Sequence, residues 1–143
     1  MRLREIAAAV VAVAACTSSS SRAQDALRDR LSLPDGLTIG EFARVGGVRF
    51  MALAADGSVY ASRPGSGEVV RLVDADENGQ AESQTVAVSG LSRPHGLAFH
   101  GGYLYIANTS GVVRVRLGAN GVAATKAEQV NSYSGGGGHW SRS

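Results

Sequence analysis

An internal repeat constrains the fold of this chain more than any other feature of its sequence. Residues 51–62 resemble residues 95–108, and the same pattern returns after 43 to 45 positions. The matched residues are Leu53 and Leu97, Gly57 and Gly101, Tyr60 and Tyr105, and the Val-Val-Arg triplets at 69–71 and 112–114. Each unit alternates short apolar segments with glycine-containing turns. We therefore expect repeated β-sheets that stack on one another.

Turn chemistry and hydrophobic alternation both favour an all-β fold. The dipeptides at 56–57 and 101–102 are Asp-Gly and Gly-Gly, and glycine accepts the positive φ that tight hairpins require. Residues 113–117 alternate valine or leucine with arginine, which gives a strand one buried and one solvated face. Residues 37–43 also alternate apolar and polar side chains, so they predict a further strand.

The repeat length indicates a particular β architecture. A period of roughly 40–50 residues with about four short strands is typical of a β-propeller blade, and propellers close a ring of ~4–8 blades. We expect repeats at 48–91 and 92–138, a third blade beginning near residue 139, and a connecting segment with a first strand at 24–47. The 143 residues therefore predict a partial propeller of about two and a half blades.

The first 23 residues have the pattern of a secretory signal peptide. Arg2 and Arg4 form a basic region, and the apolar run at 6–15 is too short to span a bilayer. A lipoprotein leader cleaved before Cys16 is the alternative, with membrane attachment only through lipidation of that cysteine. Both interpretations predict export, to the periplasm or outside the cell.

The charge balance argues against a nucleic-acid partner. The net charge of +2 belongs largely to the leader, and removal of residues 1–23 leaves 11 basic and 11 acidic residues. No basic stripe remains that would bind a phosphate backbone. Cys16 is the only cysteine, so no intramolecular disulfide is expected.

The segment 74–79 resembles the start of a calcium loop, with Asp74, Asp76 and Asn78 at positions one, three and five and glycine at six. Thr85 stands at position twelve, where such loops use a bidentate glutamate. The alternative is an acidic hairpin tip whose side chains cap their own backbone. Because the strongest ligand is missing, we favour the hairpin tip and predict no metal ligand here.

Two loops are expected at one mouth of the stacked sheets. Arg63 follows a strand of the first unit, and it either binds an anionic ligand there or is a solvated turn residue. Arg93 and His95 precede the first strand of the second unit. They either face a central ligand or shape the turn, with His95 bonded to neighbouring backbone.

His139 is the residue with the strongest case for chemistry. It follows four glycines at 135–138 and is flanked by Trp140 and, three positions on, Arg142. Histidine exchanges protons near neutral pH, so it can serve as a general base for a substrate hydroxyl. The alternative interpretation is a histidine in a glycine-rich tail.

The residues at 103–109, 112–114 and 138–142 together resemble the glucose/sorbosone dehydrogenase-like proteins. The likeness extends over residues 33–143, and the Gly-His-Trp-Ser-Arg segment is its most specific part. The resemblance implies an exported quinoprotein with a six-bladed β-propeller. Such proteins use pyrroloquinoline quinone, held with a calcium ion, to oxidise a sugar.

The resemblance also implies roles for single residues. His139 matches the catalytic base, and Arg142 matches a basic position that would lie near the quinone carboxylates or the substrate. Residues 63–71 resemble the first-blade hairpin of the family, and Arg63 is a second candidate to contact the cofactor. The family's main cofactor and calcium ligands belong to later blades, so this chain alone is not expected to hold the cofactor. The sugar and the electron acceptor stay open. The rival hypotheses are a non-catalytic binding propeller of the NHL type, which presents loops to a protein or glycan, and an inactive truncated fragment.

Overall fold

The computed structural model describes residues 30–134, which fall into two units that divide after Gly40. The described part of the first unit, residues 30–40, contains no helix or strand, and a turn there is closed by a hydrogen bond from the Leu37 amide to the Pro34 carbonyl. All strands belong to the second unit. No helix with the length and apolar character needed to cross a membrane occurs between residues 30 and 134.

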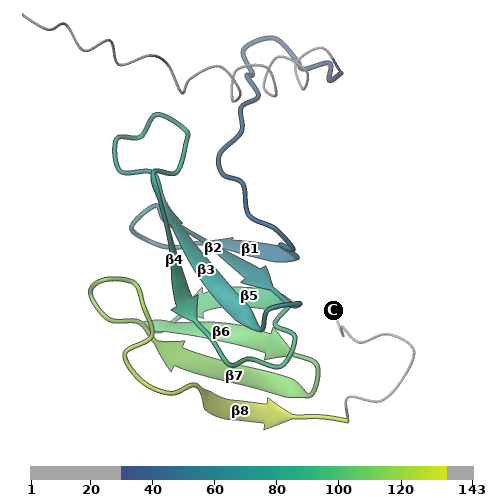
Figure 1. Ribbon diagram of the computed structural model, residues 1–143, viewed down its shortest axis with the longest axis vertical. Helices are drawn as coiled ribbons and strands as arrows, with labels where there is room; N and C mark the ends of the chain where they lie inside the picture. The colour runs from purple at the N-terminus through teal and green to yellow at the C-terminus, as the bar shows by residue number, and fades with distance from the viewer. Residues whose placement is uncertain (1–29, 135–143) are drawn as a thin grey trace, which may run out of the picture. The chain divides into compact units, whose positions relative to one another are not determined.

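The second unit contains two four-stranded antiparallel sheets, each built from strands that are consecutive in the sequence (Figure 1). The first sheet has the order β1-β2-β3-β4 and the second the order β5-β6-β7-β8. The bounds are β1 Phe50–Leu53, β2 Val59–Arg63, β3 Glu68–Val73, β4 Ser83–Val88, β5 Gly96–His100, β6 Tyr103–Asn108, β7 Gly111–Arg116 and β8 Glu128–Ser132. The first strands of the two sheets, β1 and β5, lie next to each other. Each predicted repeat therefore contains one complete meander.

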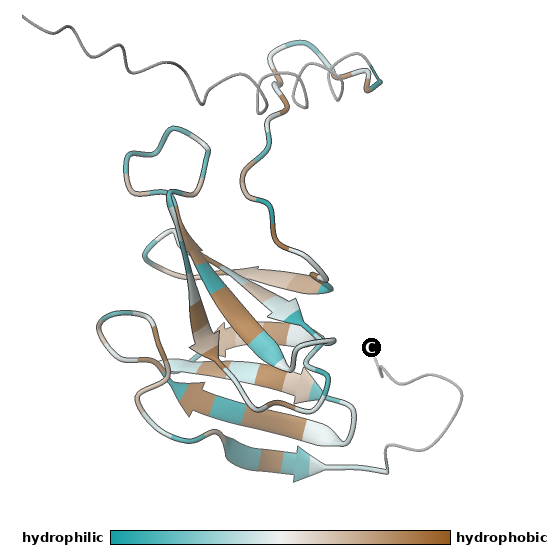
Figure 2. Ribbon diagram, viewed as in Figure 1, coloured by the Kyte–Doolittle hydropathy of each residue, from teal (hydrophilic) through white to brown (hydrophobic). Residues whose placement is uncertain are grey.

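The core lies between the two sheets. It is formed by apolar side chains on the inward faces of both: Tyr60, Val69, Ala87, Val88, Leu97, Leu104, Ile106, Val113 and Val115. Along β7 the valines at 113 and 115 are buried and the arginines at 114 and 116 are not, as the alternation predicts. Figure 2 shows the resulting bands of apolar and polar residues along the strands. Tyr60 and Phe99 meet edge to face across the core, with ring centroids 5.1 Å apart.

Backbone and side-chain hydrogen bonds join the sheets at several places. The Leu91 amide donates to the Gly67 carbonyl at 2.9 Å, and the Ala123 amide donates to the Ala87 carbonyl at 2.8 Å. The Ser62 hydroxyl adds a contact of 3.3 Å to the backbone carbonyl of His95. The linker between β4 and β5 and the connector between β7 and β8 are therefore both fixed to the first sheet.

The prediction of an all-β fold is confirmed, and the Asp-Gly and Gly-Gly dipeptides form the β1–β2 and β5–β6 turns. The predicted strand at 37–43 is wrong, because residues 37–43 have no regular structure and the first strand is β1. A strand needs a partner edge as well as alternation. In this stretch the Phe42 carbonyl accepts one hydrogen bond, from the Ala81 amide, and no ladder forms.

Candidate functional site

Two of the three predicted site residues, His139 and Arg142, lie outside the described residues, as do Cys16 and the leader. Their roles remain predictions. The third, Arg63, lies at the end of β2, and His95 lies just before β5 at the same end of the sheets.

Arg63 is held by the hairpin in which it lies. Its Nη1 atom donates to Glu68 Oε2 at 2.9 Å across the β2–β3 pair, and its Nε donates to the Gly46 carbonyl at 2.9 Å. The side chains of Arg63 and Glu68 are 29% and 25% exposed. A shallow hollow beside the guanidinium is lined by Arg63 and Ser66, by Gly65 of the β2–β3 turn, and by the glycines at 46–47 before β1. Arg63 is therefore held in place by its own hairpin and the Gly46 loop, and its contact with an anionic ligand stays a prediction.

His95 is buried in the linker between the sheets, at 5% exposure. Its Nδ1 lies 3.3 Å from the Arg93 carbonyl, and its amide donates to the Ala107 carbonyl at 2.9 Å. Arg93 has a φ of 50°, so the chain turns sharply two residues before the histidine. These contacts agree with the interpretation in which the His95 ring bonds to neighbouring backbone and shapes the turn.

A charged network occupies the opposite end of the first sheet. Arg71 Nη2 donates to Asp56 Oδ2 at 2.8 Å, and Arg71 Nε donates to the Ser58 hydroxyl at 3.1 Å. The Ser58 hydroxyl donates in turn to Asp56 Oδ1 at 2.6 Å. Bonds from the Ser58 hydroxyl and amide, with a smaller contribution from Arg71, lower the pKa of Asp56 to about 2. The carboxylate is therefore ionised at neutral pH and orders the β1–β2 turn.

Tyr60 connects this network to the second sheet. Its hydroxyl donates to the Gly121 carbonyl at 2.8 Å in a buried environment. Burial raises the pKa of the Tyr60 phenol. The phenol therefore stays a neutral donor, and its contact with the β7–β8 connector is structural.

The acidic loop 74–82 joins β3 to β4, as the hairpin-tip interpretation predicts. Asp74 accepts hydrogen bonds from the amides of Asn78 and Gly79 at 3.1 and 2.8 Å, and Asp76 accepts one from Asn78 at 3.2 Å. Carboxylate oxygens of Asp74, Asp76 and Glu82 lie within 4.8 Å of one another, a spacing compatible with a cation. The side chains nonetheless cap their own backbone.

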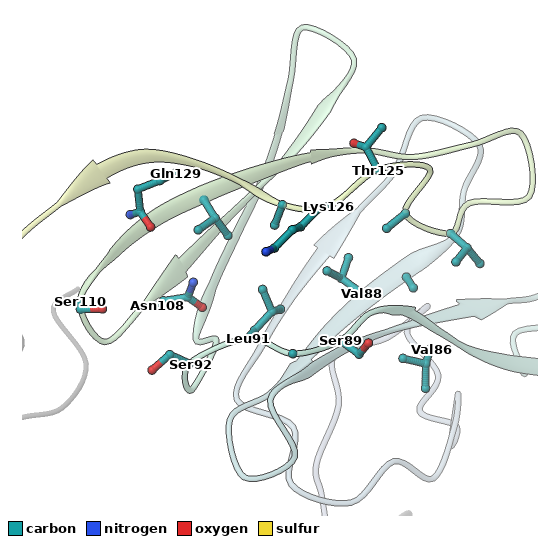
Figure 3. Close-up of a pocket in the computed structure, with 16 residues that line it drawn as sticks. Val86, Val88, Ser89, Leu91, Ser92, Asn108, Ser110, Thr125, Lys126 and Gln129 are labelled. Atoms are coloured by element: carbon teal, nitrogen blue, oxygen red, sulfur yellow. The ribbon is translucent and has the colours of Figure 1, made fainter.

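A groove lies between the sheets, with a cavity volume of about 600 Å³ (Figure 3). Residues 86–92, which are the end of β4 and the start of the linker to β5, form one wall. The second sheet and residues 122–127 of the β7–β8 connector form the other wall. Val88 and Leu91 supply apolar surface, and serine hydroxyls lie at the rim. Lys126 and Asn108 point into the groove from the second sheet and its connector. We call this feature the inter-sheet groove.

Sequence reasoning missed the inter-sheet groove and the charged network. Asp56 and Arg71 meet because the β2–β3 register pairs Tyr60 with Arg71. The sequence alone does not give this strand register, because Asp56 and Arg71 are 15 positions apart. Asn108 and Lys126 offered one weak signal, an amide and the chain's only lysine in a unit rich in valine.

Comparison with known proteins gives no relative: no protein-family model, no curated protein and no solved structure matches the chain.

Proposed function

We propose that this chain is the N-terminal part of an exported quinoprotein oxidoreductase, in which the two sheets are the first blades of a β-propeller. In this proposal a sugar is oxidised by hydride transfer to pyrroloquinoline quinone, and His139 removes the proton from the substrate hydroxyl. The chain's own contribution is a scaffold that brings the His139 segment to the mouth of the propeller.

The observation that carries the proposal is the position of His95 in the repeat. Each repeat holds one four-stranded meander, and the first strands β1 and β5 lie side by side, as inner strands of neighbouring blades do. Residue 139 follows residue 95 by 44 positions, the length of the repeat. In this proposal a third unit repeats the same spacing, so that His139 corresponds to His95, at the end of the sheets that also carries Arg63.

The described residues do not form a quinone site by themselves. Arg63 is the only predicted cofactor residue among residues 30–134, and its guanidinium is already paired with Glu68. A quinone with three carboxylates is best held by arginine side chains whose guanidinium N–H groups point at those carboxylates. We therefore assign no cofactor contact to the described residues, and the proposal depends on groups outside them.

Sugar-dependent dye reduction tests the proposal. The protein encoded by the complete reading frame is loaded with pyrroloquinoline quinone and Ca²⁺, and turnover is measured with a panel of aldoses. We expect His139→Ala to lower kcat by about 10²–10⁴-fold, the usual contribution of a general base. His100→Ala is the matched control, because His100 is an exposed residue at the end of β5. Absence of turnover, or full activity of His139→Ala, contradicts the proposal.

Binding without catalysis is the second candidate, and the outer face of the second sheet favours it where no further blade covers that face. Tyr103 and Tyr105 lie on this face with ring centroids 6.4 Å apart. The guanidinium carbons of Arg114 and Arg116 lie 4.5 and 4.4 Å from the centre of the Tyr103 ring. Aromatic and arginine side chains are typical anchors of protein interfaces. Binding of a protein or glycan without quinone-dependent turnover distinguishes this function from the first.

A further inference from the structure

The inter-sheet groove contains a polar atom whose hydrogen-bonding capacity is not used. Asn108 is 7% exposed, and its Oδ1 atom has no hydrogen-bond partner within the described part of the chain. A buried amide oxygen without a donor is unfavourable, because it has lost its water without gaining a partner. Asn108 points into the groove (Figure 3). A ligand that donates a hydrogen bond to Asn108 Oδ1 removes the free-energy cost of leaving this atom without a partner.

The groove is also lined by a positively charged side chain. Lys126 is the chain's only lysine, and it points into the same groove from the β7–β8 connector (Figure 3). No ion pair of Lys126 is found among residues 30–134, where the four ion pairs all use arginine. An ammonium beside an apolar wall favours an anion, and a carboxylate is a suitable partner for it.

The lining decides what else the ligand must carry. Val88, Leu91 and Val113 offer apolar surface for a carbon skeleton, and Ser92 and Ser110 offer hydroxyls at the rim. Small-molecule sites commonly combine apolar walls with a few polar groups that fix orientation. The volume of about 600 Å³ lies within the usual range of small-molecule sites.

We propose that the inter-sheet groove binds a small hydroxylated carboxylate. The carboxylate pairs with the Lys126 ammonium, a ligand hydroxyl donates to Asn108 Oδ1, and the carbon chain packs on the valine and leucine side chains. The proposal is independent of the proposed oxidation, because the groove lies between the sheets and contains neither Arg63 nor His95.

The single lysine gives a direct assay. Reductive methylation with ¹³C-formaldehyde labels Lys126 and the N-terminal amine, and methylation keeps the ammonium charge. The probes are three six-carbon compounds: gluconate has the charge and the hydroxyls, glucose has only hydroxyls, and hexanoate has only the charge. We expect gluconate to shift the Lys126 methyl resonance saturably. Glucose and hexanoate should each bind at least about tenfold more weakly, because each lacks one of the two polar contacts.

Variants measured by calorimetry complete the test. Lys126→Gln, on an exposed part of the connector, should weaken gluconate binding about tenfold or more. Asn108→Leu should weaken it by a similar factor, with folding checked by circular dichroism. Arg116→Gln removes the same charge from outside the groove and should leave binding unchanged. Lack of saturable gluconate binding overturns the proposal, as does equal affinity in wild type and Lys126→Gln.

Discussion

Replacement of Gly67 by alanine tests how the two sheets are joined. Gly67 has a φ of 68°, and a Cβ atom built there lies 2.5 Å from the Leu91 carbonyl oxygen. A left-handed conformation costs an alanine about 1–2 kcal/mol. The close contact is with backbone, so the linker must move, which weakens the bond of 2.9 Å from the Leu91 amide to the Gly67 carbonyl. Loss of that bond adds about 1 kcal/mol.

We therefore expect Gly67→Ala to lower the free energy of unfolding by about 2–3 kcal/mol. For a domain of this size that corresponds to a fall in Tm of about 10–20 °C. Thermal and urea unfolding of the purified chain, followed by circular dichroism, measures both quantities.

Substitutions at two other glycines separate the conformational cost of a left-handed alanine from the cost of the contact with Leu91. Gly57 has a φ of 81° and nothing within 4 Å of a built Cβ, so Gly57→Ala should show only the conformational cost of about 1–2 kcal/mol. Gly65 lies in the same turn as Gly67, has open space around its Cβ, and is outside the left-handed region. Gly65→Ala should be neutral or slightly stabilising. If Gly67→Ala is no more destabilising than Gly57→Ala, the contact with Leu91 does not contribute and the reasoning is refuted.

Four further substitutions are measured by the same urea unfolding. The folded pKa of Asp56 is about 2, below its usual 3.8, so its contribution to stability is present above about pH 4 and is lost as pH falls toward 2. Its side chain is 54% exposed, so Asp56→Asn should cost only about 1 kcal/mol at pH 7, and a difference from wild type that persists at pH 2 contradicts the assignment. Tyr60→Phe leaves the Gly121 carbonyl unpaired and should cost about 1–2 kcal/mol, whereas no change would show that the buried bond is replaced by water. Leu104→Ala at a fully buried position should cost about 2–5 kcal/mol, and Val86→Ala, which is 43% exposed, less than about 1 kcal/mol.

The strands were predictable from the sequence wherever local chemistry determines them. Glycine dipeptides placed the β1–β2 and β5–β6 turns, and the alternation at 113–117 placed the buried face of β7. The same alternation at 37–43 failed, because pairing with a second strand is a property of distant residues. The internal repeat indicated which segments form sheets where alternation alone did not, because two segments of similar sequence are expected to fold alike.

The candidate sites were less predictable, because side chains from different elements build them. Asp56 and Arg71 are 15 residues apart and meet only in the observed strand register. Asn108 ends β6, while Lys126 belongs to a connector that crosses to the first sheet through the Ala123 amide. No local pattern encodes that crossing. The acidic loop at 74–82 is the opposite case, since the side-chain hydrogen bonds of Asp74 and Asp76 are local and the sequence predicted that they cap their own backbone.

The inter-sheet groove owes its shape to the linker between β4 and β5. Leu91 lines the groove and is tied to the first sheet through Gly67, while the end of the linker at His95 accepts a bond from Ser62. Both attachments use backbone groups of the linker, so they fix its path whatever side chains it carries. A displacement of Leu91 therefore changes the wall that faces Lys126 as well as the packing between sheets. Stability and ligand binding are coupled at this linker because the same hydrogen bonds join the sheets and form the groove.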